Sequence, residues 1–457
     1  MTTSVSEMIE LLKYVFNAFS SINEGVGNYI FNFYTSYSRI ILDYMHISFE
    51  TLFKIFLYTT IILASFYLFM SFFVLFSKRQ KSKIATGNLP YVTVQIPTYN
   101  ELAALNCAKR CLNFDYPKNK LQIIIGDDSN DIEISKKIDL FASKYKNIQI
   151  TRRGCNVGFK PGNLNYMLKY TKGEYIVIFD SDFLPGKFFL KKIIAPFLED
   201  KNVAVVQTRW RIFNFNQNII SILGGSISTM FHHIAMEFIK RINGNCFLCG
   251  SGEAIKKKDL VDVGGWQAGS LTEDIECSFR LITKGKKLVY LEDVEVDCEV
   301  PYTFKDLCKQ QMRWAFGVIT ALIKHGKTIF NSKSCKLKDK ISVFIFASGY
   351  FFSFLLLGLT FFGVLSLISD RPAAIDWPKF ISETSFNIVL TSGFLLTSII
   401  ALVRVKKKRF LPKMITASLS LGLAVTYYVN IGILKAIFGR QMQWFMLNKN
   451  GNKCLEE

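Results

Sequence analysis

Long apolar segments occur near the beginning of the chain and in its last quarter, whereas the segment between them mixes apolar and polar positions. Residues 53–77 are almost uninterruptedly apolar, and residues 341–368 and 386–403 repeat this pattern. A helix of about 20 apolar residues crosses the hydrocarbon core of a bilayer. We therefore predict a membrane-spanning helix at each of these three positions.

Two further segments are apolar but interrupted by polar side chains. Residues 8–50 mix the two kinds at helical spacing, and residues 411–437 contain Pro412, Lys413 and several serines and threonines. Amphipathic helices of this kind lie along membrane surfaces. We predict an interfacial position for 8–50 and either an interfacial or a membrane-spanning position for 411–437.

The middle of the chain predicts an α/β domain. Short runs rich in β-branched residues alternate there with helical stretches, and the runs cover residues 91–96, 121–125, 175–179 and 203–206. Such alternation is typical of a mainly parallel sheet covered by helices. Because ligands bind beyond the carboxyl ends of the strands in such sheets, we expect the site at the ends of the first three strands.

The formal net charge of +20 places this domain relative to the membrane. Clusters of Lys and Arg at residues 78–83 and 404–409 each adjoin an apolar run. Positive residues next to a span stay on the cytoplasmic side, so the charge indicates membrane lipids rather than nucleic acid as the partner. We predict a multi-pass membrane protein of four parts: an N-terminal membrane segment (1–83), a cytosolic α/β domain (84–300), interfacial helices (301–340) and C-terminal membrane helices with a cytosolic tail (341–457).

The third strand leads directly into Asp180-Ser181-Asp182. Two carboxylates one residue apart at a strand end can share one ion, and Mg²⁺ or Mn²⁺ is typically held by one or two carboxylates together with substrate phosphates. Such an ion would neutralise the charge of a diphosphate leaving group. The alternative reading is a pair of solvated turn aspartates. We predict Asp180 and Asp182 as metal ligands.

The first two strands end in polar residues as well. Thr98, Tyr99 and Glu101 follow the first strand, and Asp127 and Asp128 follow the second. An acid pair at this position can accept hydrogen bonds from a base or a ribose, and Tyr99 offers a face for stacking. Ordinary capping of the next helices explains either motif alone equally well.

Two downstream motifs supply groups for phosphate contact and proton transfer. Lys160, in the run Lys-Pro-Gly-Asn-Leu-Asn near a helix start, brings a cation and backbone amides suited to phosphate, although helix capping by Asn163 accounts for part of this motif. Thr272-Glu273-Asp274, with Glu276, places carboxylates before a helix, where one could act as a general base toward a sugar hydroxyl. First-turn acids also complement a helix dipole, which is the structural alternative.

A Gln-x-x-Arg-Trp motif follows at Gln310, Arg313 and Trp314. The Trp ring can form the floor of a sugar site, and the Gln and Arg can hold hydroxyls or a diphosphate. A basic amphipathic helix at a membrane surface would look similar.

In order and spacing, the motifs from Pro97 to Trp314 resemble those of the processive family-2 glycosyltransferases, which include cellulose, mannan, hyaluronan and chitin synthases. The resemblance implies a GT-A-type fold, an inverting mechanism and a UDP- or GDP-sugar donor. It makes Asp274 the catalytic base that deprotonates the acceptor hydroxyl. It also implies that Asp127 or Asp128 contacts the nucleobase and ribose of the donor, and that Asp180 and Asp182 hold the diphosphate and the metal.

The same resemblance extends to the acceptor side and to the tail. Gln310, Arg313 and Trp314 would line the acceptor and diphosphate side, and the run Phe-Leu-Cys-Gly-Ser ending at Ser251 would put Cys249 and Gly250 at the acceptor site. The segment 439–449 is similar to a gating segment whose Lys449 would meet the diphosphate, although Leu447 replaces the family's threonine. Such a tail would have to be cytoplasmic, which favours an interfacial helix at 411–437.

Within the family, Val-Gln-Thr-Arg-Trp at 206–210 looks like plant mannan and xyloglucan-backbone synthases, while Phe-Leu-Cys-Gly-Ser is closer to cellulose synthases. We therefore expect glucose or mannose as the transferred sugar and a β-glycan as the product. The alternative is a non-processive transferase with a lipid-linked acceptor, similar to ceramide glucosyltransferases. Few spans suggest that a second copy or an accessory subunit completes a pore. If the organism is a eukaryote, the membrane would be the plasma membrane or the Golgi.

Overall fold

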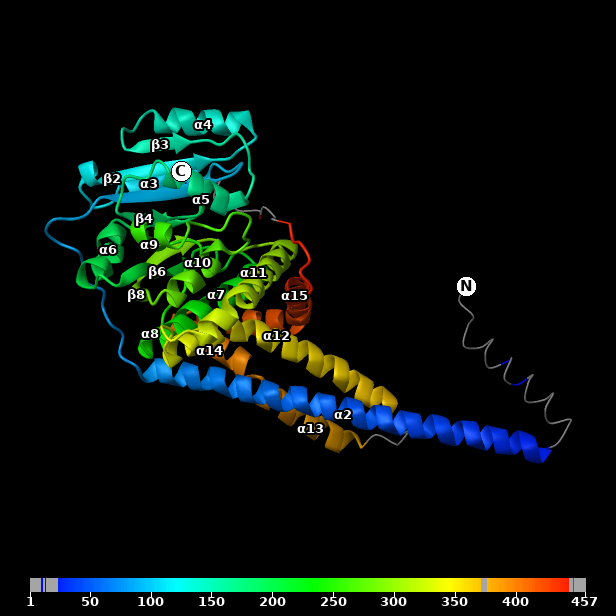
Figure 1. Cartoon of the computed structure of the whole chain (residues 1–457). Helices are drawn as coiled ribbons and strands as arrows, with labels where there is room; N and C mark the ends of the chain where they lie inside the picture. Colours follow the sequence, from blue (N-terminus) through cyan, green and yellow to red (C-terminus); the bar gives the residue numbers. More distant parts are fainter. Residues whose placement is uncertain (1–9, 11–12, 14–23, 371–375, 444–446, 448–457) are drawn as a thin grey trace. The chain divides into compact units, whose positions relative to one another are not determined.

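A computed structural model describes residues 10, 13, 24–370, 376–443 and 447 of the chain. It divides into two compact units, one formed by Met1–Thr60 with Leu355–Ile388 and the other by Ile61–Phe354 with Val389–Glu457. The second unit holds the predicted α/β domain (Figure 1).

An eight-stranded sheet forms the centre of the second unit, in the order β3-β2-β1-β4-β7-β6-β8-β5. Its strands are β1 (Val92–Thr98), β2 (Leu121–Asp127), β3 (Ile148–Thr151), β4 (Tyr175–Ile178), β5 (Leu184–Pro185), β6 (Val203–Ile212), β7 (Glu253–Lys256) and β8 (Lys287–Cys298). Strands β1 to β4 are parallel neighbours, and β6 is parallel to β8. Strand β7 runs antiparallel to both β4 and β6, and β5 runs antiparallel to β8.

The four predicted strands are confirmed in position, and the sheet is mainly parallel as expected. Strands β1 and β2 are buried along their whole length because helices cover both faces of the sheet (Figure 1). Strand β6 continues to Ile212, well past the predicted end at 206, because it pairs with β8 over that length. The register sets Thr98 beside Asp127, which brings the polar strand ends to one edge.

Helices and short helical turns lie between the strands, and α11 follows the last strand. They are α3 (Ala103–Leu112), η1 (Lys118–Lys120), α4 (Ile132–Ala142), α5 (Phe159–Leu168), α6 (Phe189–Glu199), α7 (Ile219–Met230), η2 (Phe231–Ala235), α8 (Met236–Arg241), α9 (Lys257–Asp262), α10 (Glu273–Thr283) and α11 (Phe304–Asn331). Asn163 does not cap α5, which begins four residues earlier at Phe159; its side chain instead donates to the carbonyl oxygen of Gly126 at 2.7 Å.

Four helices in the described part of the chain are long and apolar enough to cross a membrane. Two of them include the predicted spans at 53–77 and 341–368, namely α2 (Glu24–Phe76) and α12 (Leu337–Ser369). A third contains η3 (Lys408–Phe410) and α15 (Leu411–Ile437), so the segment 411–437 is a single helix. Which segments cross a membrane and which lie on it stays a prediction.

The fourth such helix, Ile219–Arg241, has no counterpart among the predicted spans. It consists of α7, η2 and α8. Of its most apolar 18-residue stretch, 78% is buried inside the protein. Helices α14 (Gly393–Arg404) and α15 pack against α7, and Leu402 and Met414 join the core that lies beside the sheet. The apolar surface of this helix is therefore covered by protein.

The predicted span at 386–403 is not one continuous helix. Helix α13 (Trp377–Thr391) ends before Ser392, and α14 begins at Gly393. A Cβ atom at Gly393 would lie 2.2 Å from the carbonyl oxygen of Ala64, so this position approaches α2 too closely for any side chain. The periodicity of 386–403 reveals neither this break nor the close contact of Gly393 with α2.

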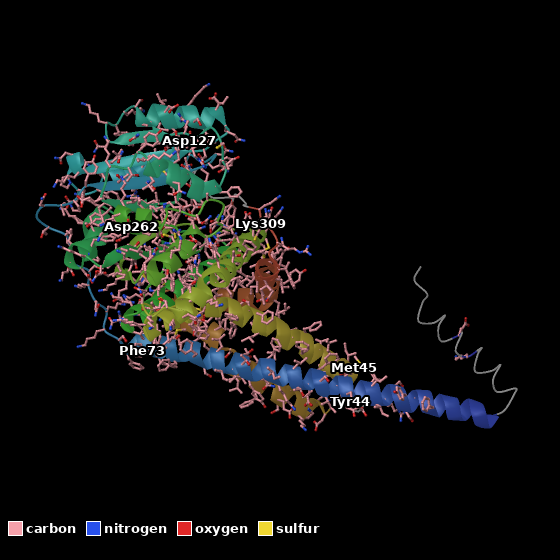
Figure 2. The ribbon with its side chains drawn as sticks, viewed as in Figure 1. Tyr44, Met45, Phe73, Asp127, Asp262 and Lys309 are labelled. Carbon is pink, nitrogen blue, oxygen red and sulfur yellow. The ribbon has the colours of Figure 1, made fainter. Side chains whose placement is uncertain are left out.

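In the first unit, α2 continues toward the N-terminus as the same helix, without a boundary at residue 50. Its apolar side chains are widely exposed there, and Tyr44 is 70% and Met45 42% exposed (Figure 2). An extended row of exposed apolar side chains needs an apolar surrounding, which favours contact of this part with a membrane.

Close packing of α11 against α15 positions the Gln-x-x-Arg-Trp motif. A Cβ atom at Gly432 of α15 would lie 2.3 Å from the carbonyl oxygen of Met312 on α11. We expect Gly432→Ala to force the two helices apart and to lower stability by about 1–3 kcal/mol. Thermal unfolding in detergent measures this effect.

The matched control is Gly422→Ala on the same helix, because a Cβ atom there would meet nothing within 4 Å. This variant should unfold at or slightly above the wild-type temperature, since Ala is the better helix former. Equal destabilisation by both substitutions would contradict the packing argument.

Candidate active site

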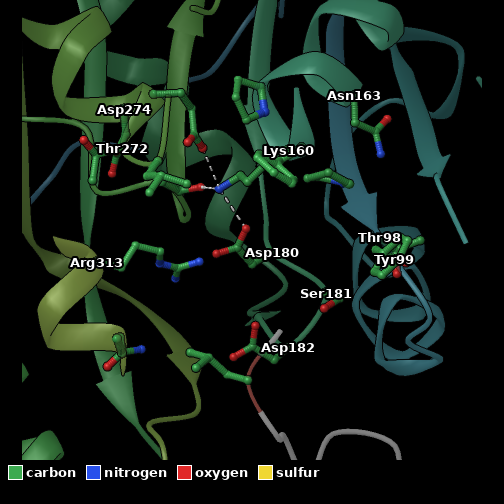
Figure 3. A pocket seen from close by; sticks show the side chains of 18 of the residues that line it. Thr98, Tyr99, Lys160, Asn163, Asp180, Ser181, Asp182, Thr272, Asp274 and Arg313 are labelled. Carbon is green, nitrogen blue, oxygen red and sulfur yellow. Dashed lines mark hydrogen bonds and ion pairs between the residues drawn. The ribbon is translucent and has the colours of Figure 1, made fainter. Parts of the chain in front are cut away.

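A cleft at the carboxyl edge of the sheet brings together almost all of the predicted site residues. It contains Thr98, Tyr99, Glu101, Asp128, Lys160, Asp180, Asp182, Cys249, Gly250, Asp274, Gln310, Arg313 and Trp314. These residues come from positions more than 200 apart in the chain, and the fold places them around one space (Figure 3). Their convergence could not be read from the single motifs.

The ammonium group of Lys160 lies at the centre of the cleft (Figure 3). Its Nζ atom lies 2.8 Å from Asp180 Oδ1 and 3.2 Å from Glu273 Oε1, and it donates to the carbonyl oxygen of Gly250 at 2.6 Å. Burial opposes the charge, but Asp180 and Glu273 raise the pKa of Lys160 above its usual range. The cleft therefore contains a permanent cation that joins three of its walls.

Asp274 lies in the first turn of α10, next to this cation. Burial and the adjacent Glu273 carboxylate raise the pKa of Asp274 to about 7, against the opposing effect of Lys160. A carboxylate with a pKa near neutrality accepts a proton more readily than an ordinary aspartate. Asp274 is thus suited to act as a general base, as the resemblance implies.

Asp180 and Asp182 follow β4 and both line the cleft. The backbone N–H of Asp180 donates to Ser251 Oγ at 2.8 Å, and Ser181 Oγ donates to Glu101. Glu101 therefore also anchors the Asp-Ser-Asp turn to the loop after β1.

Asp180 and Asp182 are also the predicted ligands of a divalent metal ion. No group of three or more His, Cys, Asp or Glu side chains with metal-binding geometry occurs in the described ranges. Carboxylate oxygens are nevertheless the donors that Mg²⁺ and Mn²⁺ prefer, and such ions commonly complete their shell with substrate phosphates and water. The position next to Asp180 already attracts a positive charge, that of Lys160. The residues fit a divalent ion that arrives with a phosphate ligand.

The acid pair after β2 divides into two different environments. Asp128 lines the cleft, and its carboxylate accepts from Arg153 Nε at 3.0 Å. Asp127 does not line the cleft; it accepts from Arg152 at 2.8 Å and from Ser135 Oγ at 2.7 Å. The structure thus places Asp128 rather than Asp127 where it can contact a ligand.

The pKa directions of the two carboxyls follow these environments. Burial raises the pKa of Asp128, against the effect of Arg153. Burial also acts on Asp127, but hydrogen bonds from Ser129, Ser135 and Arg152 outweigh it and lower its pKa. Asp127 therefore stays ionised as the partner of Arg152.

The loop that carries Cys249 and Gly250 is held by two buried polar residues. Glu253 Oε2 accepts the backbone N–H of Cys249 at 3.0 Å and of Gly250 at 2.8 Å. Gln207 Oε1 accepts the Cys249 N–H at 2.8 Å. Sequence reasoning missed Gln207 and Glu253 as contributors to the site. No local signal marked either residue, because β6 and β7 carry other polar side chains as well.

Aromatic side chains form another wall. Trp314 and Trp210 line the cleft with ring centroids 6.5 Å apart, and Phe183 lies 5.3 Å from Trp210 by the same measure. The Trp210 Nε1–H donates to the carbonyl oxygen of Ser251 at 3.0 Å, which fixes the ring. Trp210 was noticed only as part of a family motif, and its role as cleft lining is a finding of the structure.

The remaining predicted groups lie at the α11 side and in the tail. Gln310 and Arg313 line the cleft, and the Arg313 guanidinium points toward Asp180 (Figure 3). Burial lowers the pKa of Arg313, while Glu273 and Asp180 oppose that shift. Leu447 also lines the cleft, so the tail reaches the site. Lys449 lies outside the described residues.

Two family models match this chain over overlapping ranges. Residues 90–317 match the model described as glycosyltransferase-like family 2, and residues 248–419 match the cellulose synthase model. A mannosyltransferase from Pyrobaculum calidifontis, solved in complex with GDP-Man and Mn²⁺, superposes with a TM-score of 0.62 at 17% identity, covering 86% of this chain and 100% of that chain. This likeness confirms the predicted GT-A-type fold.

Curated relatives match more than half of the chain. A probable glucomannan 4-beta-mannosyltransferase from Oryza sativa subsp. japonica is 33% identical over 267 residues, which cover 56% of this chain and 45% of that protein. A glucomannan 4-beta-mannosyltransferase from Arabidopsis thaliana is 31% identical over 272 residues, 57% of this chain and 50% of that protein. The chain therefore spans about half the length of the curated relatives it matches.

The raised pKa of Asp274 makes a prediction about stability. A group whose pKa is near 7 when folded and near 3.8 when unfolded costs stability as the pH rises between these values. We expect Asp274→Asn to unfold at a higher temperature than the wild type at pH 8, and the difference to shrink steadily as the pH falls to 5. Unfolding scans across this pH range measure it. A pH-independent difference would contradict the raised pKa.

Proposed function

Because this chain carries a family-2 glycosyltransferase domain, we propose that it transfers a hexose from a nucleotide diphosphate sugar to a growing β-linked glycan. One observation carries the proposal: a phosphate-suited cation, an Asp-x-Asp pair and a carboxylate with a pKa near 7 line the same cleft. Each of these groups serves a different part of a sugar nucleotide reaction.

The donor would lie along the strand ends. Thr98, Tyr99 and Asp128 at the ends of β1 and β2 suit the nucleoside, because parallel-sheet folds bind nucleotides at such edges. Lys160 and Arg313 suit the two phosphates. Asp180 and Asp182 would hold Mg²⁺ or Mn²⁺, which when bound supplies neutralisation of the charge on the diphosphate.

The transfer itself requires removal of one proton. The acceptor hydroxyl oxygen forms a bond to the anomeric carbon while the bond from that carbon to the diphosphate oxygen breaks. Asp274 takes the hydroxyl proton, and the bonding electron pair leaves with the diphosphate beside Lys160 and Arg313. Attack from the face opposite the leaving group inverts the anomeric configuration, as the family resemblance implies.

The acceptor would occupy the aromatic side of the cleft. Trp210 and Trp314 give flat apolar faces on which sugar rings can stack, and Gln310 offers hydrogen bonds to hydroxyls. Cys249 and Gly250 lie between this wall and Lys160. A glycan end seated there has its hydroxyl near Asp274.

Similarity to the two glucomannan 4-beta-mannosyltransferases favours mannose as the sugar. Glucose is the second candidate, because of the cellulose synthase match. The apolar helices and adjoining Lys and Arg clusters support a membrane protein whose catalytic domain is cytoplasmic.

Transfer with purified full-length protein in detergent tests this proposal. With Mn²⁺ and labelled GDP-mannose or UDP-glucose, the wild type should incorporate sugar into glycan, and Asp274→Asn should lose about 10²–10⁴-fold in rate. The wild-type rate should also fall as the pH drops below about 7, where Asp274 becomes protonated.

The matched control is Asp262→Asn, since Asp262 is an exposed residue at the end of α9 (Figure 2). It should keep wild-type activity. Full activity in a folded Asp274→Asn protein would contradict the assigned base. Recovery of a single added sugar in the lipid fraction would contradict the glycan acceptor and support a lipid-linked one.

A further inference from the structure

A second hollow lies away from the cleft, between the end of α2 and the start of α12. This groove has a volume of about 530 Å³, within the range of about 300–1,000 Å³ typical of small-molecule sites. It shares no lining residue with the cleft. Phe66, Phe238, Ile242, Lys336, Leu337, Lys338 and Ile341 line it.

Phenylalanine rings build its wall. Phe238 of α8 is 5% exposed, and its ring lies edge-on to three rings of α2, with centroids 6.2 Å from Phe66, 6.0 Å from Phe69 and 5.2 Å from Phe73. Phe66 also contacts Phe344 of α12, at 6.1 Å. Figure 2 shows Phe73 at the end of α2. The wall is apolar and fixed by mutual packing.

The opposite side is held rigidly as well. Asn245, in the loop after α8, donates to Asp339 Oδ1 at 3.1 Å, and Gly244 approaches α12 so closely that a Cβ atom would lie 2.1 Å from Ser342 Oγ. Tyr67 of α2 forms a hydrogen bond with Ser348 of α12 at 2.9 Å. The groove is therefore a preformed feature of the second unit.

Two lysines are among the residues that line this otherwise apolar groove. Lys336 is exposed and Lys338 half-buried, and neither has a carboxylate partner among the residues that the structure describes. Asp339, on the same turn, is buried and accepts hydrogen bonds from the Lys336 N–H and from Asn245. The two ammonium groups remain available to an anion.

The groove also lies where a membrane would end. Helices α2 and α12 are both long and apolar enough to span a bilayer, and basic residues follow the first and precede the second. Leu337 is 74% and Ile341 36% exposed beside the groove, although both are large and apolar. Exposed apolar side chains next to a pair of lysines are typical of the depth at which lipid acyl chains meet the headgroups.

From these observations we infer that the groove binds one anionic phospholipid, with an acyl chain against Phe66 and Phe238 and its phosphate near Lys336 and Lys338. The lipid is a bound partner of the membrane helices, not a sugar acceptor. This inference rests on the membrane position included in the proposed function. It adds a defined site to that position.

Charge complementarity selects the lipid class. A zwitterionic headgroup carries a positive charge of its own, which offsets the attraction of its phosphate to the two ammonium groups, whereas a headgroup with net negative charge is attracted as a whole. A soluble anion would use the lysines but not the apolar wall. Both features together fit a molecule with an anionic head and an apolar tail.

The test uses the full chain in nanodiscs of phosphatidylcholine with a minor share of photoreactive phosphatidylserine. Crosslinked peptides are mapped, and retained lipid is counted by native mass spectrometry. We expect crosslinks concentrated on 238–242 and 336–341. K336Q/K338Q should weaken phosphatidylserine retention roughly 30-fold.

Two comparison variants make the result specific. K144Q/K146Q removes the same charge from exposed lysines of the α/β domain and should retain the lipid as the wild type does. Ile341→Trp fills the groove without changing charge and should reduce retention of both charged and neutral lipid there.

Crosslinks spread evenly over all apolar helices, or equal retention in K336Q/K338Q and K144Q/K146Q, would overturn the inference. Transfer of labelled sugar onto the bound lipid would also overturn it, because the lipid would then be an acceptor. Sugar transfer measured in the same nanodiscs keeps the two proposals separate: an active enzyme without groove-bound lipid refutes only the groove. An inactive wild type that retains the lipid refutes only the transferase proposal.

Discussion

The organisation of the catalytic cleft depends on one ammonium group among several carboxylates. Lys160 joins Asp180, Glu273 and the carbonyl oxygen of Gly250, which belong to three segments far apart in the sequence. Isolated charges are costly to bury, and this cost is offset only by close, well-directed partners. Without Lys160, the carboxylates of the cleft would repel one another. The same arrangement leaves Asp274 beside Glu273 with incomplete compensation, and its raised pKa follows from that balance.

The surrounding fold fixes the carboxylates around this cation. Thr272 directly precedes α10 and packs against Gly317 of α11, where a Cβ atom would lie 2.2 Å from the Thr272 Cγ2 atom. Further along the same two helices, His325 Nε2 lies 2.9 Å from Glu276 Oε1. The helix that carries Asp274 is thus held against the helix that carries Arg313 and Trp314. These contacts between α10 and α11 fix the distance from Asp274 to Arg313 and Trp314.

Local patterns predicted the parallel strands and the motifs at their ends, because strand burial and chain reversal at a sheet edge are largely local properties. The remaining features depend on tertiary contacts. Neighbouring residues at a strand end point in different directions, so only the fold separates Asp128 in the cleft from Asp127 beside Arg152. The break at Ser392 and the approach of Gly393 to Ala64 have no signal in the apolar run itself, and the antiparallel strand β7 enters the sheet from a distant segment. The role of Glu253 was missed because one glutamate at the start of a short strand that also carries a lysine has no local signature.

The proposed function requires Asp180 and Asp182 to bind a nucleotide diphosphate through a divalent ion, in a cleft organised by Lys160. Calorimetric titration of GDP and UDP into the full-length protein, with and without Mn²⁺, tests it most directly. Mn²⁺ should tighten the binding of GDP or UDP to the wild type at least about tenfold, because charge-assisted contacts are worth about 1.5–3 kcal/mol. It should have no effect on nucleotide binding by a folded D180N/D182N protein. An equal effect of Mn²⁺ on both proteins would contradict the account.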